Sequence, residues 1–158
     1  MPTRSAIRRL FLHPKSSYTL SAAARLLGIS TKELRGWIDS GEIEAVETQL
    51  GLVLPWEEVV FFGMDFWTQA VVEAALGVDL AEAIPELVQS TELNVRLPRM
   101  EVAALERVAA REGLTVDAVL ASELLDFVSA EGAWLSQEIA GFPEALKWPA
   151  SSQTVSRP

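Results

Sequence analysis

The sequence contains no cysteine and a single histidine, His13. The lack of cysteine excludes disulfides, thiolate zinc sites, iron–sulfur clusters and cysteine-dependent catalysis. With one imidazole, a Ser–His–Asp triad or a two-histidine metal site would have to be built around His13, directly before Pro14. We therefore expect no enzyme activity, no metal and no cofactor, and the composition is compatible with a reducing cytoplasm.

Long hydrophobic runs are also missing. Three acidic residues, Glu57, Glu58 and Asp65, interrupt the most apolar region, residues 50–67, so no run reaches the length of about 18 residues typical of a membrane span. The N-terminal arginines precede only a short apolar patch, which does not fit a secretory signal. We expect a cytoplasmic protein without membrane segments, whose 158 residues, 49% of them hydrophobic, form one or two small domains.

Basic residues are absent between residues 36 and 95, which carry twelve acidic residues. By contrast, residues 1–35 carry seven basic residues and one acidic residue, although the whole chain has a net charge of -9. Only the local potential meets the phosphates of a nucleic acid, so a compact basic end can bind DNA in an acidic protein. The alternative is a solvated basic arm, which we delimit as residues 1–17.

Residues 18–63 have the local signals of a helix–turn–helix. An Ala- and Leu-rich helix begins near Ser21 and ends at Gly28, and Ser30 with Glu33 has the spacing of a capping box. An apolar stripe then continues the second helix to Gly41 through Leu34, Trp37 and Ile38. Such a second helix can lie in a major groove, where the residues off its apolar stripe meet bases or phosphates. Those residues are Thr31, Lys32 and Arg35.

After this pair of helices, residues 43–46 and 52–54 are predicted to form a hairpin, and Pro55 precedes a further helix. The motifs Ala-Ala-x-Leu-Leu-Gly-Ile-Ser and Trp-Ile-x-Ser-Gly occur in residues 18–63, which resemble the winged helix–turn–helix of the MerR and excisionase families. The resemblance implies DNA binding through the second helix. The wing departs from the family, because acidic and neutral residues replace its usual basic ones: Glu44, Glu47, Thr48 and Gln49. The alternative is a helix–turn–helix retained only for packing.

Residues 92–97 alternate between polar and apolar side chains, as a half-buried strand does. Pro98 ends this strand, and two amphipathic helices follow over 99–112 and 116–130. Their predicted inward residues are Leu105, Val108, Ala109, Val119, Leu120, Leu124, Phe127 and Val128. A lone strand needs a partner, so we expect a homodimer in which two copies of it pair above four helices. The predicted dimer interface contains Leu93, Val95, Leu97 and Leu124.

The segments Glu-Leu-Asn-Val-Arg-Leu-Pro and Arg-Glu-Gly-Leu-Thr-Val make residues 92–130 resemble the ribbon–helix–helix family of the Arc and MetJ repressors. The resemblance implies base reading by Glu92, Asn94 and Arg96 and phosphate anchoring at Thr115. Glu92 departs from the Gln or Lys usual at its position, and an acidic residue, Asp117, lies at the start of the anchoring helix. The alternative is a dimerisation unit that has lost contact with DNA.

Residues 64–91 are predicted to form a helical connector, with stretches over 66–76 and 80–89, that packs between the two modules. The C-terminal extension, residues 131–158, contains Trp134, Phe142 and Trp148, and its last eight residues are expected to be disordered. These aromatic residues either pack on the protein's own dimer or anchor another protein. Many ribbon–helix–helix proteins are antitoxins whose extension wraps a toxin, and this tail is similar in position.

Together these patterns predict a mainly α fold in which a winged helix–turn–helix is joined to a ribbon–helix–helix. The expected function is a cytoplasmic, homodimeric regulator of transcription that binds double-stranded DNA sequence-specifically, of the antitoxin and autorepressor type, with a toxin as protein partner. The alternative is an acidic protein-interaction module that dimerises through residues 92–130 and binds a basic partner, such as a toxin, without binding DNA.

Overall fold

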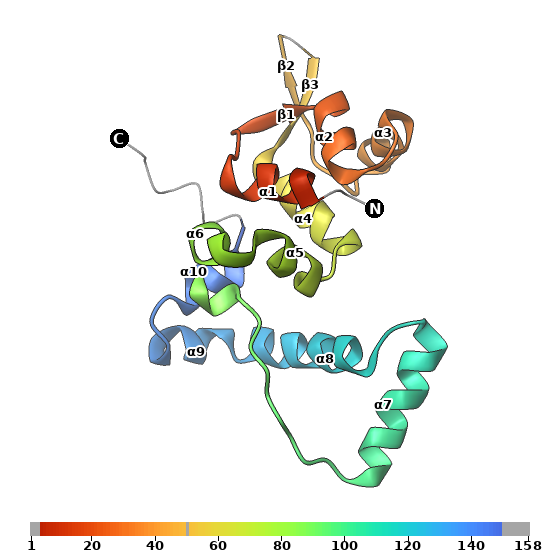
Figure 1. Cartoon of the computed structure of the whole chain (residues 1–158), viewed down its shortest axis with the longest axis vertical. Helices are drawn as coiled ribbons and strands as arrows, with labels where there is room; N and C mark the ends of the chain where they lie inside the picture. The colour runs from red at the N-terminus through yellow and green to blue at the C-terminus, as the bar shows by residue number, and fades with distance from the viewer. Residues whose placement is uncertain (1–3, 50, 150–158) are drawn as a thin grey trace. The chain divides into compact units, whose positions relative to one another are not determined.

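A computed structural model describes residues 4–49 and 51–149 of the chain. It confirms a mainly helical fold and adds a small three-stranded antiparallel sheet (Figure 1). The described residues form two compact units. Unit 1 contains the chain up to Ser90 together with Trp148 and Pro149, and unit 2 spans Thr91–Lys147.

Unit 1 contains short helices and the three-stranded sheet. Its helices are α1 (Arg4–Leu12), α2 (Leu20–Leu27), α3 (Thr31–Asp39), α4 (Trp56–Phe66), α5 (Gln69–Leu76) and α6 (Leu80–Ala83), with the 3₁₀ turns η1 (Gly77–Asp79) and η2 (Glu86–Val88). Its strands are β1 (Ser17–Thr19), β2 (Val46–Thr48) and β3 (Gly51–Pro55), and the sheet that they form contacts α2 and α4. Among the described residues no single helix is long and apolar enough to cross a membrane, and α4 with the following helical stretch passes that test only as a pair bent by 114°.

Helix α1 replaces most of the predicted basic arm. Ile7, Leu10 and Phe11 recur at helical spacing and are buried, a pattern that the neighbouring arginines obscure in the sequence. Arg8 donates hydrogen bonds to the Leu76 carbonyl at 2.9 Å and to the Asp79 carboxylate at 2.5 Å. These contacts satisfy the C-terminal end of α5, where free carbonyls and the helix dipole favour a cation. An N-terminal arginine therefore fixes α1 to α5 instead of adding to a free basic surface.

The sheet has the order β1-β3-β2, with both pairs antiparallel. Strand β1, which the sequence pattern does not predict, pairs Tyr18 with Leu54. The prediction of a strand over residues 43–46 is wrong except for its last residue. The cause is that the Ile43 amide donates to the Trp37 carbonyl at 3.3 Å and the Ile43 side chain is buried, which turns the chain back onto α3 before the strand begins.

Residues of the predicted connector pack into unit 1. Helix α4 continues to Phe66, and Trp67 is buried with its indole against Gly63, where an added Cβ would lie 2.8 Å from Trp67 Cζ3. This contact, with Thr68 capping α5, explains why the predicted helix over 66–76 begins only at residue 69. Helix α5 then packs on α1.

The end of unit 1 is held by a hydrogen-bonded carboxylate. Partial burial raises the pKa of Glu73, but hydrogen bonds from the Ser90 amide at 2.6 Å, from the Ser90 hydroxyl and from Gln69 at 3.0 Å outweigh it, so the pKa lies below its ordinary value of 4.5. Glu73 therefore stays ionised, and its hydrogen bonds hold Ser90, where the chain passes from unit 1 to unit 2, against α5.

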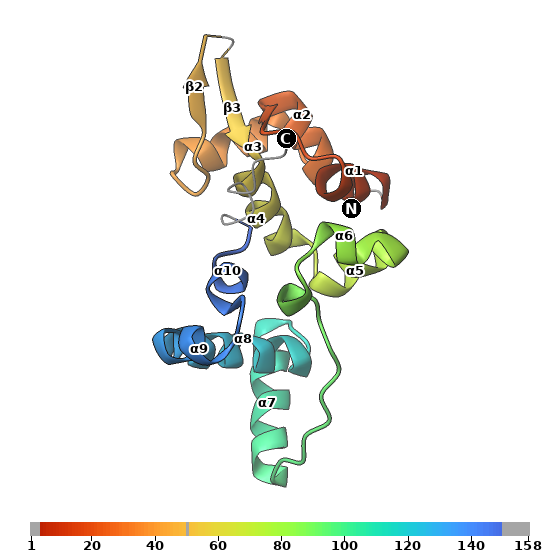
Figure 2. The same ribbon diagram turned by 90° about the vertical axis from the view of Figure 1, so that its left-hand side faces the viewer.

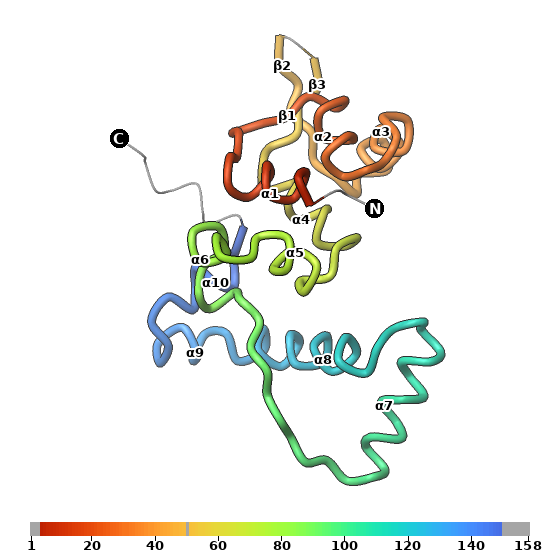
Figure 3. The backbone as a smooth tube through the Cα atoms, in the orientation of Figure 1, coloured from red at the N-terminus to blue at the C-terminus, as the bar shows by residue number. Residues whose placement is uncertain are grey.

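Unit 2 consists of α7 (Arg99–Glu112), α8 (Val116–Ala130), α9 (Gly132–Glu138) and α10 (Phe142–Lys147). The first two have the predicted bounds, with Gly113 as the left-handed cap of α7 and Thr115 as the N-cap of α8. Residues 91–98 are neither helical nor paired in a ladder, as the tube in Figure 3 shows.

Few side chains of unit 2 are buried. Among its described residues, Ala109 and Val119 are the buried hydrophobic side chains, and four others predicted to point inward are half-buried: Leu105, Val108, Leu120 and Val128. Leu124 and Phe127, which are also predicted to point inward, are exposed in the single chain. The predicted disorder of the last eight residues lies outside the described part of the chain.

Candidate nucleic-acid interface

Helices α2 and α3 lie side by side and are joined by a three-residue turn over 28–30 (Figure 1). Thr19 caps the start of α2 by accepting a hydrogen bond from the Ala22 amide at 3.3 Å. Gly28 ends α2 with a φ of 75°, a conformation that a side chain would strain, and its amide donates to the Ala24 carbonyl. The tight turn predicted from Gly28 is thus confirmed.

The start of α3 is fixed by the predicted capping box. The Ser30 amide donates to Glu33 Oε2 at 2.8 Å, and the Glu33 amide donates to Ser30 Oγ at 3.2 Å. The hydrogen bonds with the Ser30 side chain and backbone lower the pKa of Glu33 below its ordinary 4.5. The carboxylate therefore stays ionised near neutral pH, and two of the orphan amides at this helix end are satisfied.

The inner face of α3 packs on α4. Leu34 is fully buried, and the Trp37 ring lies 4.7 Å from the Phe62 ring and 5.6 Å from the Phe66 ring, between centroids. Phe62 and Phe66 form an edge-to-face pair at 4.9 Å, so the three rings make one aromatic cluster. This cluster fixes the rotation of α3 about its own axis and thereby decides which residues face outward.

The outward residues are the ones that the apolar stripe predicts. Thr31, Lys32 and Arg35 are exposed, and within the described part of the chain their side chains have no hydrogen-bond or ion-pair partner. Arg25 on α2, which is not among the predicted DNA-binding residues, is exposed as well. Two exposed cations on α3 with a third on the preceding helix can meet phosphate oxygens and guanine edges.

The hairpin β2–β3 follows α3 (Figure 2), and its exposed charged residues are acidic. Every residue of β2 is exposed, including Glu47, and the preceding Glu44 is exposed too. The Glu44 amide donates to Glu58 Oε2 at 3.1 Å, which adds a second carboxylate at the base of the hairpin. The wing is therefore acidic and would repel phosphates, unlike the exposed cations of α2 and α3.

The second predicted set of DNA-binding residues belongs to unit 2. Glu92, Asn94 and Arg96 are exposed on the unpaired stretch before α7. The Thr115 hydroxyl accepts from the Ala118 amide at 3.2 Å, so its side chain caps α8. Without a paired strand these residues form no defined surface in one chain, whereas Thr31, Lys32 and Arg35 are brought together by one helix.

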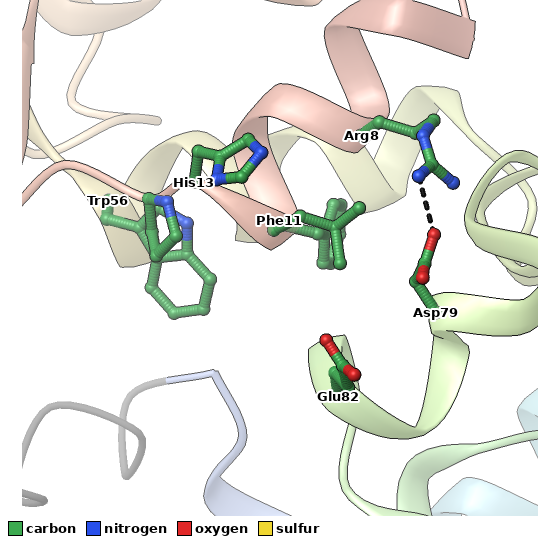
Figure 4. Close-up of a pocket in the computed structure, with 8 residues that line it drawn as sticks. Arg8, Phe11, His13, Trp56, Asp79 and Glu82 are labelled. Atoms are coloured by element: carbon green, nitrogen blue, oxygen red, sulfur yellow. Dashed lines mark hydrogen bonds and ion pairs between the residues drawn. The ribbon is translucent and has the colours of Figure 1, made fainter.

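Unit 1 also contains a cavity of about 380 Å³, shown in Figure 4. Its lining includes Arg8, His13 and Trp56 together with the carboxylates of Asp79 and Glu82. The Arg8 guanidinium already binds Asp79, and the buried Trp56 indole donates to the Leu10 carbonyl at 2.8 Å. Among the described residues no cluster of three His, Asp or Glu is arranged to hold a metal ion. The polar groups of the cavity thus hold α1 to α4 and to the turn η1.

Comparison with known proteins places the chain in no family: no family model, curated protein or solved structure matches it. The case for the candidate interface therefore rests on its geometry and charge: α3 is anchored on one face and presents Lys32 and Arg35 on the other.

Proposed function

We propose that the protein is a homodimeric, sequence-specific regulator of transcription that inserts α3 into the major groove of double-stranded DNA. The observation that carries the proposal is the two-sided character of α3. Its inner face is fixed by Leu34 and by the aromatic cluster around Trp37, while Lys32 and Arg35 project freely from exposed positions. A rigid helix with unpaired long cations is what major-groove reading requires.

The two cations have different roles in this proposal. Arg35 presents a planar fork that can donate two hydrogen bonds to O6 and N7 of one guanine, the contact that discriminates best among base pairs. Lys32 is a compact charge suited to phosphate, and Thr31 adds a hydroxyl at the first turn of the helix. The exposed carboxylates of the hairpin repel phosphates, so the proposed footprint of unit 1 consists of α2 and α3.

The small number of apolar side chains that unit 2 buries supports the homodimer. Leu93 is 77% exposed in the single chain, and Val95, Leu97 and Leu124 are exposed too. With so little apolar surface covered, residues 91–147 lack the core that a unit of this size needs. Antiparallel pairing of residues 92–97 with a second copy satisfies the free backbone groups and covers these side chains.

A dimer presents two copies of α3, so the operator is expected to be a pseudo-palindrome with half-sites about one helical turn, or a multiple of it, apart. In the paired ribbon Glu92, Asn94 and Arg96 would add base contacts, and the turn at Thr115 would approach a phosphate. These ribbon contacts are part of the same proposal and are tested separately by Asn94→Ala with Arg96→Ala.

Exposed apolar residues at the C-terminal end favour a second candidate function, which is binding of a basic protein such as a toxin. Trp134 is 57% exposed, and Ile139 and Leu146 are exposed nearby in sequence. Exposed Trp side chains are frequent hot spots of protein interfaces. An autorepressor of the antitoxin type would combine both functions, with DNA bound through α3 and the toxin bound through α9 and α10 in the cytoplasm.

The test is a titration of the DNA upstream of the protein's own gene, followed by fluorescence anisotropy. The double variant Lys32→Ala/Arg35→Ala should bind at least about tenfold more weakly, because each lost base or phosphate contact costs about 1–3 kcal/mol. Arg9→Ala/Lys15→Ala is the matched control, since it removes the same charge from exposed positions outside α3. Equal effects of the two double variants, or an affinity independent of salt, would contradict the proposal.

The second candidate function predicts a different outcome. If neither the α3 variants nor the ribbon variants change DNA binding, but the chain co-purifies with one stoichiometric basic protein encoded by a neighbouring gene, the protein is an interaction module. Loss of that partner in Trp134→Ala would then assign the interface to the C-terminal helices.

A further inference from the structure

Gly36 lies in the middle of the exposed face of α3. An α-helix turns about 100° per residue, so Gly36 comes one turn after Lys32 and on the side opposite Leu34. Leu34 is fully buried and Gly36 is exposed, in agreement with this geometry. The residue without a side chain thus lies about 40° around the helix from Lys32 and about 100° from Arg35, on the face that presents both cations proposed to contact DNA.

Nothing within the chain requires glycine at this position. Gly36 is not among the residues with positive φ, so its backbone conformation is open to any residue. A Cβ built on Gly36 would meet no atom within 4 Å, so no neighbour would be displaced. Glycine inside a helix is nevertheless less favourable than alanine, because its backbone loses more conformational freedom on folding. The fold alone would therefore be more stable with alanine.

At the other eight glycines, all within the described residues, the fold itself accounts for the absence of a side chain. Six adopt a positive φ: Gly28, Gly41, Gly51, Gly77, Gly113 and Gly141. Gly63 lies against the Trp67 ring, and Gly132 is buried near Leu146. Gly36 is the exception, because neither its φ nor a neighbouring atom within the described residues requires glycine there.

We propose that Gly36 is the point of closest approach between α3 and the DNA, an inference that rests on the proposed function. A Cβ projects about 1.5 Å from the backbone. Holding the helix away from the groove floor by that distance would stretch the hydrogen bonds of Arg35 beyond their range of about 2.7–3.2 Å. Gly36 would then determine specificity, because base contacts depend on the depth of insertion more steeply than phosphate contacts do.

The test compares Gly36→Ala and Gly36→Gln with the wild-type full-length protein. Binding to the upstream DNA and to random DNA of equal length is measured by anisotropy, and stability is measured by thermal unfolding. Ala74→Gln is the matched control, because Ala74 is exposed on α5 of the same unit. Gly36→Ala should unfold at a higher temperature than the wild type.

The expected loss of affinity for the upstream DNA is about 5- to 150-fold for Gly36→Ala, the range produced when a methyl group is forced into a packed contact, and larger for Gly36→Gln. Binding to random DNA and binding by the control should change by no more than about twofold. Together with a raised unfolding temperature, this result would assign the loss to the interface with DNA and not to the fold.

Two results would overturn the inference while leaving the proposed function in place: wild-type protein prefers the upstream DNA but Gly36→Ala binds it equally well, or Gly36→Ala unfolds at a lower temperature than the wild type. A wild-type protein that does not prefer its upstream DNA to random DNA would instead refute the proposed function, and the inference with it.

Discussion

Replacing Phe62 with leucine tests the contact that orients α3. Phe62 is 9% exposed and its ring pairs with Trp37 and with Phe66, whereas its neighbour Phe61 on the same helix is 64% exposed and has no ring partner among the described residues. The two substitutions Phe62→Leu and Phe61→Leu are chemically identical and adjacent. They therefore separate the loss of the aromatic cluster from any general effect of the change on α4.

The magnitude follows from the two ring pairs. Each aromatic pair contributes about 0.5–1.5 kcal/mol beyond the burial of apolar area, so Phe62→Leu should lower the free energy of unfolding by about 1–3 kcal/mol. Phe61→Leu should change it by no more than about 0.5 kcal/mol, because its side chain is exposed. With a urea m value of about 1–3 kcal/mol/M, a loss of about 2 kcal/mol moves the unfolding midpoint down by about 1 M.

Tryptophan fluorescence during urea unfolding of the full-length chain is the suitable assay. Trp37, Trp56, Trp67 and Trp148 belong to unit 1, and only Trp134 belongs to unit 2, so the signal mainly follows the unit that contains α3. Equal midpoint shifts for the two variants, or a larger shift for Phe61→Leu, would refute the packing of α3 on α4 and the orientation of its outer face.

Two further predictions concern the end of unit 1 and the dimer. The folded-state pKa of Glu73 is lowered from 4.5, so its contribution to stability is complete above that pH and is lost as the pH falls through the folded value. The hydrogen-exchange protection of the Ser90 amide should therefore fall as the pH is lowered through the folded pKa of Glu73. Glu73→Ala should lack this pH dependence. Protection that does not change with pH in the wild type would contradict the prediction. Val95→Asp, which places two charges in the proposed ribbon interface, should raise the dimer dissociation constant by about 100-fold or more in sedimentation equilibrium. Asn94→Asp, on the opposite face, should remain dimeric, and a dimeric Val95→Asp would refute the paired ribbon.

The elements that could be predicted from the sequence are those specified by local signals. Gly28 determines the end of α2, and the Ser30–Glu33 pair determines the start of α3, through contacts three to five residues apart, so the turn between these two helices could be predicted. Gly113 and Thr115 bound α7 and α8 in the same way. The exposed positions of α3 followed from its apolar stripe.

The elements that were missed depend on contacts distant in sequence. Strand β1 is only three residues long and exists because β3 pairs with it, and the break after α4 depends on Trp67 packing against Gly63. Helix α1 has apolar residues at helical spacing, Ile7, Leu10 and Phe11, but its three arginines make the same residues resemble a solvated basic arm. Gly36 was overlooked at the candidate site because only side chains able to donate hydrogen bonds were considered.

Methylation of a bound operator tests most directly whether α3 lies in the major groove. Dimethyl sulfate attacks guanine N7 in the major groove and adenine N3 in the minor groove, so one reaction reports on both. The wild type should protect guanine N7 in each half-site, and Lys32→Ala/Arg35→Ala should lose that protection at concentrations where it still binds. Protection confined to adenine N3, or guanine protection unchanged in the double variant, would contradict the placement of α3 in the groove.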